Sequence, residues 1–251
     1  MKNSAVGGVF HFRGVFMKKS FVLVDERISE KCLYSLLAEG FSPIKLPGVP
    51  NLPSAIASHT DIIAFKLENK IFLSKAYFNT FFDILSPLEA ENLCLTEYSQ
   101  GVNYPLDAIF NGLLMGDKLF CKRDSFSKEI IASAEKLGIK IISVKQGYPA
   151  CTVLKISENA AITADKGMAK ALRSEGISVL EIENGDVLLP PYEYGFIGGA
   201  GEAHEDKVYF FGDIHTHNDH KKIIDFIEEN KKTVHSLSDE QLRDLGGMLF
   251  I

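Results

Sequence analysis

The chain alternates short apolar segments, which predict β-strands, with amphipathic segments that have the period of an α-helix. In three places a helical segment ends at a glycine and an apolar strand follows directly: 28–39 before Gly40, 127–137 before Gly138, and 166–175 before Gly176. A glycine there is typical of a helix that ends in a left-handed residue, because glycine has no Cβ to oppose a positive φ. A fourth helix, 219–229, ends at Asn230, the next most suitable residue. The strands expected after these four helices are 41–46, 139–144, 177–182 and 233–237.

Tight turns between pairs of short apolar strands give an independent count of the units. These turns are Glu68-Asn69, Gly116-Asp117, Glu158-Asn159 and Glu205-Asp206. Such residues tolerate the backbone angles of a hairpin. Turns and helix ends both recur about every 47 residues, which indicates an internal repeat. A degenerate copy, with a helix at 77–85 and a strand at 92–96, fills the gap between Gly40 and Gly138.

Each repeat has the order strand, turn, strand, helix, strand. The last unit has only its first strand, 247–251, while the strand at 21–24, the helix after it and the strand at 41–46 supply the rest. We therefore predict an α/β propeller of five pseudo-symmetric αββαβ-type units, closed by pairing of the N- and C-terminal strands so that no sheet edge stays open. The units account for 17–251 as a single domain and leave 1–16 as an extension outside the fold. A two-layer sandwich with a chance period is the alternative.

Composition narrows the class of function. The chain of 251 residues has 27 Lys and Arg against 33 Asp and Glu, a net charge of −6, which argues against nucleic acid as a partner. It has no apolar run of about 18 residues, so we expect no membrane span. Its four cysteines are far apart and form no CxxC pair, which predicts reduced thiols in a cytoplasmic protein without a cysteine-bound metal. We expect no cofactor, and the oligomeric state stays open.

Four segments resemble an uncharacterised bacterial family with the pentein fold of guanidino-group-modifying enzymes. They are His59-Thr60-Asp61-Ile62, Lys145-Gln146-Gly147-Tyr148, Tyr194-Gly195-Phe196-Ile197-Gly198-Gly199 and Asp244-Leu245-Gly246-Gly247. The pentein group includes arginine deiminases, dimethylarginine hydrolases and amidinotransferases, and the resemblance covers about 17–251. It implies a pentein-like α/β propeller with a central channel. Its enzymes use a cysteine nucleophile, a histidine general acid/base and carboxylates that hold a guanidinium.

Only some of the functional residues of these enzymes have a match in this sequence. Glu183-Asn184-Gly185-Asp186 resembles the acidic turn of the enzymes, which makes Glu183 and Asp186 candidate ligand-binding residues. Asn111 stands where active relatives often have aspartate, and it is a third candidate. The final segment from Gly246 resembles the glycine-rich turn before the enzymes' nucleophile, yet it contains no cysteine.

Three residues elsewhere in the chain are candidates for the nucleophile and its acid/base partners. Cys151 is expected to begin the first strand of its unit, and a pseudo-symmetric ring allows the nucleophile to come from another unit. His59 and Asp61 resemble the enzymes' His-x-Asp strand, and residues two apart on a strand point the same way. The alternatives are a small buried thiol at Cys151, a strand-end turn with a solvated carboxylate at 59–61, and an exposed turn at 183–186.

The stretch from His215 to His220 matches HxHxDH, a metal signature of the metallo-β-lactamase fold, through His215, His217, Asp219 and His220. Only 31 residues follow His220, too few to supply the further ligands that such a fold needs. The repeat instead predicts a loop here, with Asn218 or Asp219 as the N-cap of the next helix.

We therefore expect a pentein-like protein that binds a small cationic guanidino or amino ligand in its channel, as a hydrolase or transferase. The catalytic set would be Cys151, His59 and Asp61. A non-catalytic ring that binds a ligand or a protein is the alternative, and a metal-dependent hydrolase using HxHxDH is a minority alternative.

Overall fold

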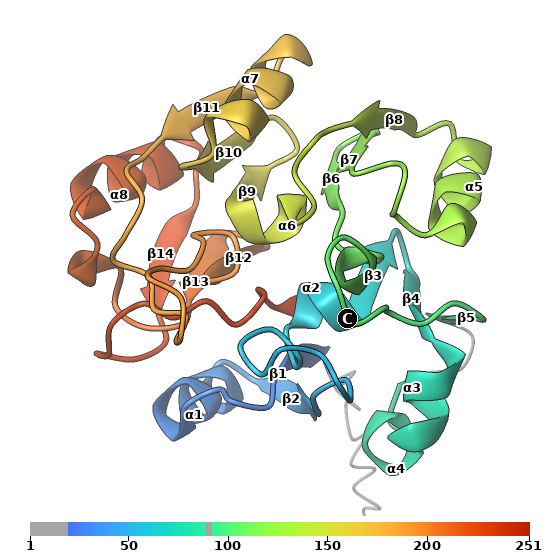
Figure 1. Ribbon diagram of the computed structural model, residues 1–251. Coiled ribbons are helices and arrows are strands. Elements are labelled where there is room, and N and C mark those ends of the chain that lie inside the picture. Colours follow the sequence, from blue (N-terminus) through green and yellow to red (C-terminus); the bar gives the residue numbers. More distant parts are fainter. Residues whose placement is uncertain (1–19, 89–91) are drawn as a thin grey trace, which may run out of the picture.

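The computed structural model describes residues 20–88 and 92–251, so the expected extension at 1–16 lies outside the described residues. Five small sheets of three strands each are arranged around a common centre (Figure 1). Each sheet combines one antiparallel pair with one parallel pair. The prediction of an α/β propeller of five similar units is confirmed.

Four sheets follow the chain in order, each with a hairpin, a helical segment and a third strand parallel to the second. The first contains β3 (Ala64–Leu67), β4 (Lys70–Ser74) and β5 (Leu93–Thr96), and the second β6 (Leu113–Met115), β7 (Lys118–Cys121) and β8 (Lys140–Ser143). The third contains β9 (Val153–Ser157), β10 (Ala160–Thr163) and β11 (Ser178–Glu181), and the fourth β12 (Gly201–His204), β13 (Lys207–Phe210) and β14 (Thr233–Ser236). The helices before the third strands are α3 (Lys75–Thr80) with α4 (Phe82–Leu85), α5 (Lys128–Lys136), α7 (Lys166–Ser174) and α8 (His220–Glu229).

The fifth sheet is built from both ends of the described chain. β15 (Leu249–Phe250) pairs antiparallel with β1 (Ser20–Asp25), with Val22 opposite Phe250. β1 in turn pairs in parallel with β2 (Phe41–Leu46), and α1 (Glu30–Ala38) connects the two. The predicted closure of the ring by its terminal strands is therefore confirmed.

Most of the residues predicted to adopt a positive φ, in the hairpin turns and at the helix ends, do so. Glu68, Gly116 and Glu205 have positive φ in three of the hairpin turns, and the cap residues Gly40, Gly138 and Gly176 have φ of 90°, 75° and 82°. The left-handed cap expected at Asn230 is wrong by one residue, since Asn230 has φ of −86° and Lys231 has φ of 60°. Asn230 stays right-handed because its N–H still bonds to Phe226 and Ile227 carbonyls.

The hydrophobic core forms a circle around the axis. Each of five buried clusters joins two neighbouring units; for example, Leu154 of β9 packs in one cluster with Phe210 of β13 and Ile223 of α8. Another cluster joins Val22 of β1 with Tyr209 of β13 and so bridges the two ends of the chain. The remaining three clusters link the other neighbours in turn. Most apolar packing therefore lies between units. A sixth, smaller cluster lies in the segments before β3 and β6 and contains Leu52, Ile62 and Ala108.

No helix within the described residues is long and apolar enough to cross a membrane.

Candidate functional site

The central polar groups come from the point at which the chain enters the first strand of each unit. Asp61 lies three residues before β3, and Asn111 and Cys151 lie two residues before β6 and β9. Because the units are pseudo-symmetric, these equivalent positions meet at the axis. Asp61 Oδ2 lies 2.6 Å from Cys151 Sγ, and Asn111 Nδ2 lies 3.4 Å from the same sulfur.

Glycines occupy the corresponding place in the other two units. The Gly199 N–H donates to the Cys151 carbonyl and the Gly247 N–H to the Gly199 carbonyl, both at 2.9 Å. The Asp61 N–H donates to the Gly246 carbonyl at 3.1 Å. A Cβ at Gly199 would lie only 1.8 Å from Asp244 Oδ1, so the close approach of this carboxylate to the backbone requires glycine. Three units thus provide side chains to the centre, and two provide backbone.

His59 lies against this centre with its imidazole buried. It precedes the short helix α2 (Thr60–Ile63) as the N-cap residue, and 1% of its surface is exposed. Neither ring nitrogen has a hydrogen-bond partner among the described residues, although Nδ1 lies 3.8 Å from Asp244 Oδ1. Asp244 is itself fixed, because Oδ1 accepts from the Gly246 N–H and Oδ2 from the Phe196 N–H. Burial lowers the pKa of His59, so the ring is neutral.

The central groups carry no positive charge to balance their acids. Burial raises the pKa of Asp61 to about 8, against the opposing effect of its hydrogen bond to Cys151. Asp61 as a residue is partly exposed, but its Oδ1 is enclosed and unpartnered among the described residues. Burial, with the nearby carboxylates of Asp61 and Asp244, raises the pKa of the Cys151 thiol well above its usual 9.0. At neutral pH the proton therefore stays on both groups.

His59, Asp61 and Cys151, called the central cluster below, lie close together. One ligand atom from each, an imidazole nitrogen, a carboxylate oxygen and the sulfur, lies within 4.8 Å of the others. Among the described residues this is the one group of three or more His, Cys, Asp and Glu side chains with such geometry. The structure thus brings together the three residues that the sequence analysis grouped as a catalytic set.

A cavity of about 410 Å³, the cysteine cavity, opens on one side of the cluster. Its lining residues are Ile56, His59, Ile62, Tyr148, Cys151, Leu189, Tyr192, Glu193, Tyr194, Phe196 and Asp244. Two carboxylates and four aromatic rings are among these described residues, with no lysine or arginine. Tyr148 is held in place by its hydroxyl, which donates to the buried carboxylate of Asp107 at 2.6 Å.

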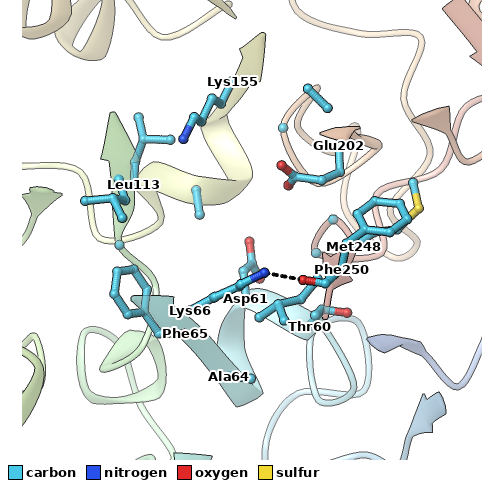
Figure 2. Close-up of a pocket in the computed structure, with 18 of the residues that line it drawn as sticks. Thr60, Asp61, Ala64, Phe65, Lys66, Leu113, Lys155, Glu202, Met248 and Phe250 are labelled. Atoms are coloured by element: carbon cyan, nitrogen blue, oxygen red, sulfur yellow. Dashed lines mark hydrogen bonds between the residues drawn. The ribbon is translucent and has the colours of Figure 1, made fainter. Parts of the chain in front are cut away.

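A second cavity of about 390 Å³, the lysine cavity, lies on the other side of the Asp61–Cys151 contact and is lined by Asp61 but not by Cys151. Figure 2 shows the Lys155 ammonium and the Glu202 carboxylate pointing into it from opposite walls. The Lys66 ammonium donates to the Phe250 carbonyl at 2.6 Å. Burial raises the pKa of Glu202 to about 7, although both lysines oppose that rise.

Two expectations about local structure are wrong. Residues 59–61 are not a strand, since His59 caps α2 and Asp61 lies in its first turn. Cys151 does not begin a strand, because it lies in the short helix α6 (Pro149–Thr152) before β9. Pro149 at the helix start is the sequence signal that could have identified this turn, because its fixed φ suits the first helical position.

Glu183 and Asp186 are not part of the central cluster. Glu183 is exposed at the edge of a separate cavity of about 180 Å³, and its backbone N–H donates to Asp219 Oδ2. Asp186 sits in a turn at φ of 61° and accepts from the Asn218 N–H. Neither residue lines the cysteine cavity. Asn111, the third ligand-binding candidate, instead touches Cys151 and fixes the Ala150 N–H through its Oδ1.

The HxHxDH stretch does not gather as a metal site. His217 Nδ1 accepts from the Asp219 N–H, His220 Nδ1 contacts the His217 carbonyl, and exposed His215 contacts Asp213. Asp219 is the N-cap of α8, as predicted, but its carboxylate bonds to Lys222 and the Glu183 N–H instead of capping the helix. No three of the four ligand candidates converge within the described part of the chain.

Sequence reasoning did not single out the residues that surround the cluster. Asp244 and Tyr148 lie in segments that carry the family resemblance, but their contacts with His59 and Asp107 join residues far apart in the chain. Lys66, Lys155 and Glu202 look like ordinary strand-end charges. Only the register of three different hairpins brings them to one cavity.

The model of a family of unknown function (DUF6873) matches residues 23–249. The chain belongs to this family. No curated protein matches the DUF6873 chain in sequence.

Solved structures identify the fold of this DUF6873 protein. A mutant dimethylarginine dimethylaminohydrolase from Pseudomonas aeruginosa, complexed with citrulline, is 11% identical with a TM-score of 0.58, covering 89% of this chain and 93% of that chain. Agmatine deiminase from C. jejuni is 8% identical with a TM-score of 0.54, covering 88% of each chain. An amidinotransferase from Microseira wollei is 9% identical with a TM-score of 0.50, covering 87% of this chain and 88% of that chain. At such identities the likeness shows the shared pentein fold alone.

Proposed function

We propose that this protein binds a small organic cation, with a guanidino or amino group, in the cysteine cavity and acts on it as a hydrolase or transferase. One observation carries the proposal: His59 and Cys151 of the central cluster line a cavity that has carboxylates and aromatic rings but no described lysine or arginine. The names of two similar structures, a dimethylarginine dimethylaminohydrolase and an agmatine deiminase, give guanidino substrates and support the same chemical class of ligand.

The cavity offers a cation two kinds of favourable interaction. The faces of Tyr148, Tyr192 and Tyr194 attract positive charge, because an aromatic ring carries negative charge on its face. A cation in the cavity lies beside the Asp244 carboxylate, and through Cys151 it is also close to Asp61, so it favours the ionised form of both carboxyls. A planar guanidinium can donate two parallel hydrogen bonds to one carboxylate, which fixes its orientation.

The same charge prepares the thiol for reaction. Once a bound cation lowers the pKa of Asp61, the carboxylate 2.6 Å from Sγ accepts the thiol hydrogen. The sulfur then bonds to the central guanidinium carbon, and the bond from that carbon to one amine breaks. Asp61 passes the thiol proton to neutral His59, whose nitrogens have no hydrogen-bond partner among the described residues, and His59 delivers it to the departing amine. Water then cleaves the carbon–sulfur bond in a hydrolase, and a second amine does so in a transferase.

Ligand binding without chemistry is the second candidate function. Burial keeps the Cys151 thiol protonated in the free protein, and the glycine-rich segment at Gly246 and Gly247 contains no cysteine. Such a ring would bind the same cations and leave them unchanged.

A thermal-shift screen with guanidino compounds, amino acids and polyamines tests the proposal. A ligand that binds only the folded chain raises the melting temperature, and we expect guanidino compounds or amines to do so. Cys151→Ala should keep this shift and lose release of the amine product. If no cation raises the melting temperature of the unmutated chain, the proposal is wrong. If a cation binds and no product forms, the binding ring is the correct function.

A further inference from the structure

We propose that the central cluster is also a binding site for a zinc-type divalent metal ion, which competes with the organic cation for the same buried groups. The metal site stands on the geometry of His59, Asp61 and Cys151 alone. Only the competition rests on the proposed function.

The three side chains offer the donor types that zinc prefers, at separations that one ion can bridge. Imidazole nitrogen, carboxylate oxygen and thiolate sulfur bind zinc at roughly 2.0–2.3 Å in a tetrahedral arrangement, so neighbouring ligand atoms lie about 3.4 Å apart. The three atoms here lie within 4.8 Å of one another. The Asp61 Oδ2 to Sγ distance of 2.6 Å must open by roughly 1 Å, or Asp61 must bind through its other oxygen.

Unpaired polar atoms at the site point independently to a missing ligand. Both nitrogens of His59 and Oδ1 of Asp61 are buried without a hydrogen-bond partner among the described residues. Folded proteins rarely leave such atoms unpaired, because each forfeits its bonds to water without replacement. An ion between these side chains gives a partner to atoms of His59 and Asp61 that have none among the described residues.

Charge and surroundings favour the same ion. Asp61 and ionised Cys151 carry two negative charges, and neither makes a described hydrogen bond to a lysine or arginine. A divalent ion balances these two negative charges, and by binding the sulfur it stabilises the thiolate directly. Asp244, 3.8 Å from His59 Nδ1 and fixed by two backbone N–H groups, has the position of a carboxylate that orients a metal-bound imidazole.

The donor set also indicates which metal binds. A thiolate with an imidazole suits zinc or cobalt, whereas magnesium and calcium prefer oxygen ligands alone. The protein supplies three ligands, so the fourth position remains for water or another small ligand. Cys151 and His59 both line the cysteine cavity, which gives that position access from the cavity.

Cobalt titration of the full chain, after chelation and dialysis, tests the site. A tetrahedral cobalt–thiolate centre absorbs through sulfur-to-metal charge transfer, so we expect that band at one cobalt per chain, displaced by one equivalent of zinc. The band should vanish in Cys151→Ser and persist in Cys94→Ser, a free cysteine outside the cluster. It should also persist in His215→Ala, which disrupts the HxHxDH stretch. Asp244→Asn should weaken zinc binding by about 10- to 100-fold.

The outcomes separate this proposal from the proposed function. Absence of the band in the folded, unmutated chain overturns the metal site whatever the variants do. A band that survives Cys151→Ser, or that disappears with Cys94→Ser or His215→Ala, overturns it as well. Circular dichroism and melting temperature establish that each variant is folded. If zinc binds while no organic cation ever shifts the melting temperature, the metal site stands and the proposed function fails. If both bind without excluding each other, the competition is wrong.

Discussion

The two cavities on either side of the Asp61–Cys151 contact differ in charge although the same ring of units forms them. The cysteine cavity has carboxylates and aromatic rings and, among its described lining, no lysine or arginine. The lysine cavity has Lys66 and Lys155 together with Glu202. A cation in the first meets only attraction, whereas in the second it meets two ammonium groups. Pseudo-symmetry therefore fixes where the cavities lie, and individual side chains decide which one suits a cation.

The largest expected difference between the cavities is in catalysis. Cys151→Ala should reduce turnover of any guanidino substrate by roughly 10³-fold or more, because it removes the atom that forms the new bond. Lys155→Met, in the other cavity, should leave turnover within about twofold. Steady-state kinetics with the ligand found by thermal shift measures both. Comparable losses in the two variants would place the chemistry outside the cysteine cavity.

The contact of Asp244, a lining residue of the cysteine cavity, with the Gly199 backbone should be sensitive to a single methyl group. Gly199→Ala places a Cβ 1.8 Å from Asp244 Oδ1 and should lower the free energy of unfolding by about 1–3 kcal/mol. Gly138→Ala is the matched control, because its φ of 75° strains an alanine while nothing lies within 4 Å of the new Cβ. Urea unfolding compares them. A Gly199 variant no less stable than the Gly138 variant would mean that the Asp244 carboxylate does not lie so close to Gly199.

Each cavity should also have its own pH range of stability in metal-free protein. A carboxyl with a raised pKa binds its proton more tightly when folded, so stability falls as pH rises above the unfolded pKa and levels off above the folded one. For Asp61 this range is from 3.8 to about 8, and for Glu202 from 4.5 to about 7. Asp61→Asn should remove a larger part of this fall than Glu202→Gln, because burial raises the pKa of Asp61 further from its usual value. Melting temperatures of the two variants and the unmutated chain across pH 5 to 9 measure this fall in stability. If both variants lose the same part of it, the two cavities do not differ in their pH dependence.

The smallest expected effect is at the mouth of the cysteine cavity. Glu193 is exposed, so water screens its attraction for a cation. Glu193→Gln should weaken cation binding by about two- to fivefold. Glu202→Gln, the same change in the lysine cavity, should leave it unaltered. Calorimetric titration in low and high salt checks both the size of the effect and its screening.

The ring could be predicted from the sequence because its signals are local. Glycine caps such as Gly40 and turn residues such as Glu68 act within a few positions, and their recurrence reveals the period. His59 and Asp61 were grouped through resemblance and Cys151 through the pseudo-symmetry of the ring, and the structure places the three close together. The reasoning about strands at His59 and Cys151 was wrong. Short helices of four residues carry too little periodicity to be distinguished from strand ends.

The surroundings of the site could not be predicted in the same way. The contact of Asp244 with His59 spans most of the chain, and no local pattern encodes it. Glu183 was expected beside the ligand because its turn resembles an acidic motif, yet it lies at a different cavity. The extent of the domain, 17–251, and a cytoplasmic location stay predictions.

The two-residue strand β15 joins the two ends of the described chain and so closes the ring. Its pairing with β1 completes the fifth sheet, and the carbonyl of Phe250 also holds the Lys66 ammonium of the neighbouring unit. Phe250 packs in the hydrophobic cluster on one side of β15, and Leu249 packs in the cluster on the other side. Releasing this short strand would therefore open the circle and free a charge in the lysine cavity in one event. The closure of the ring and the charge of the lysine cavity are therefore linked, because the Phe250 carbonyl that holds the Lys66 ammonium belongs to the strand that closes the ring.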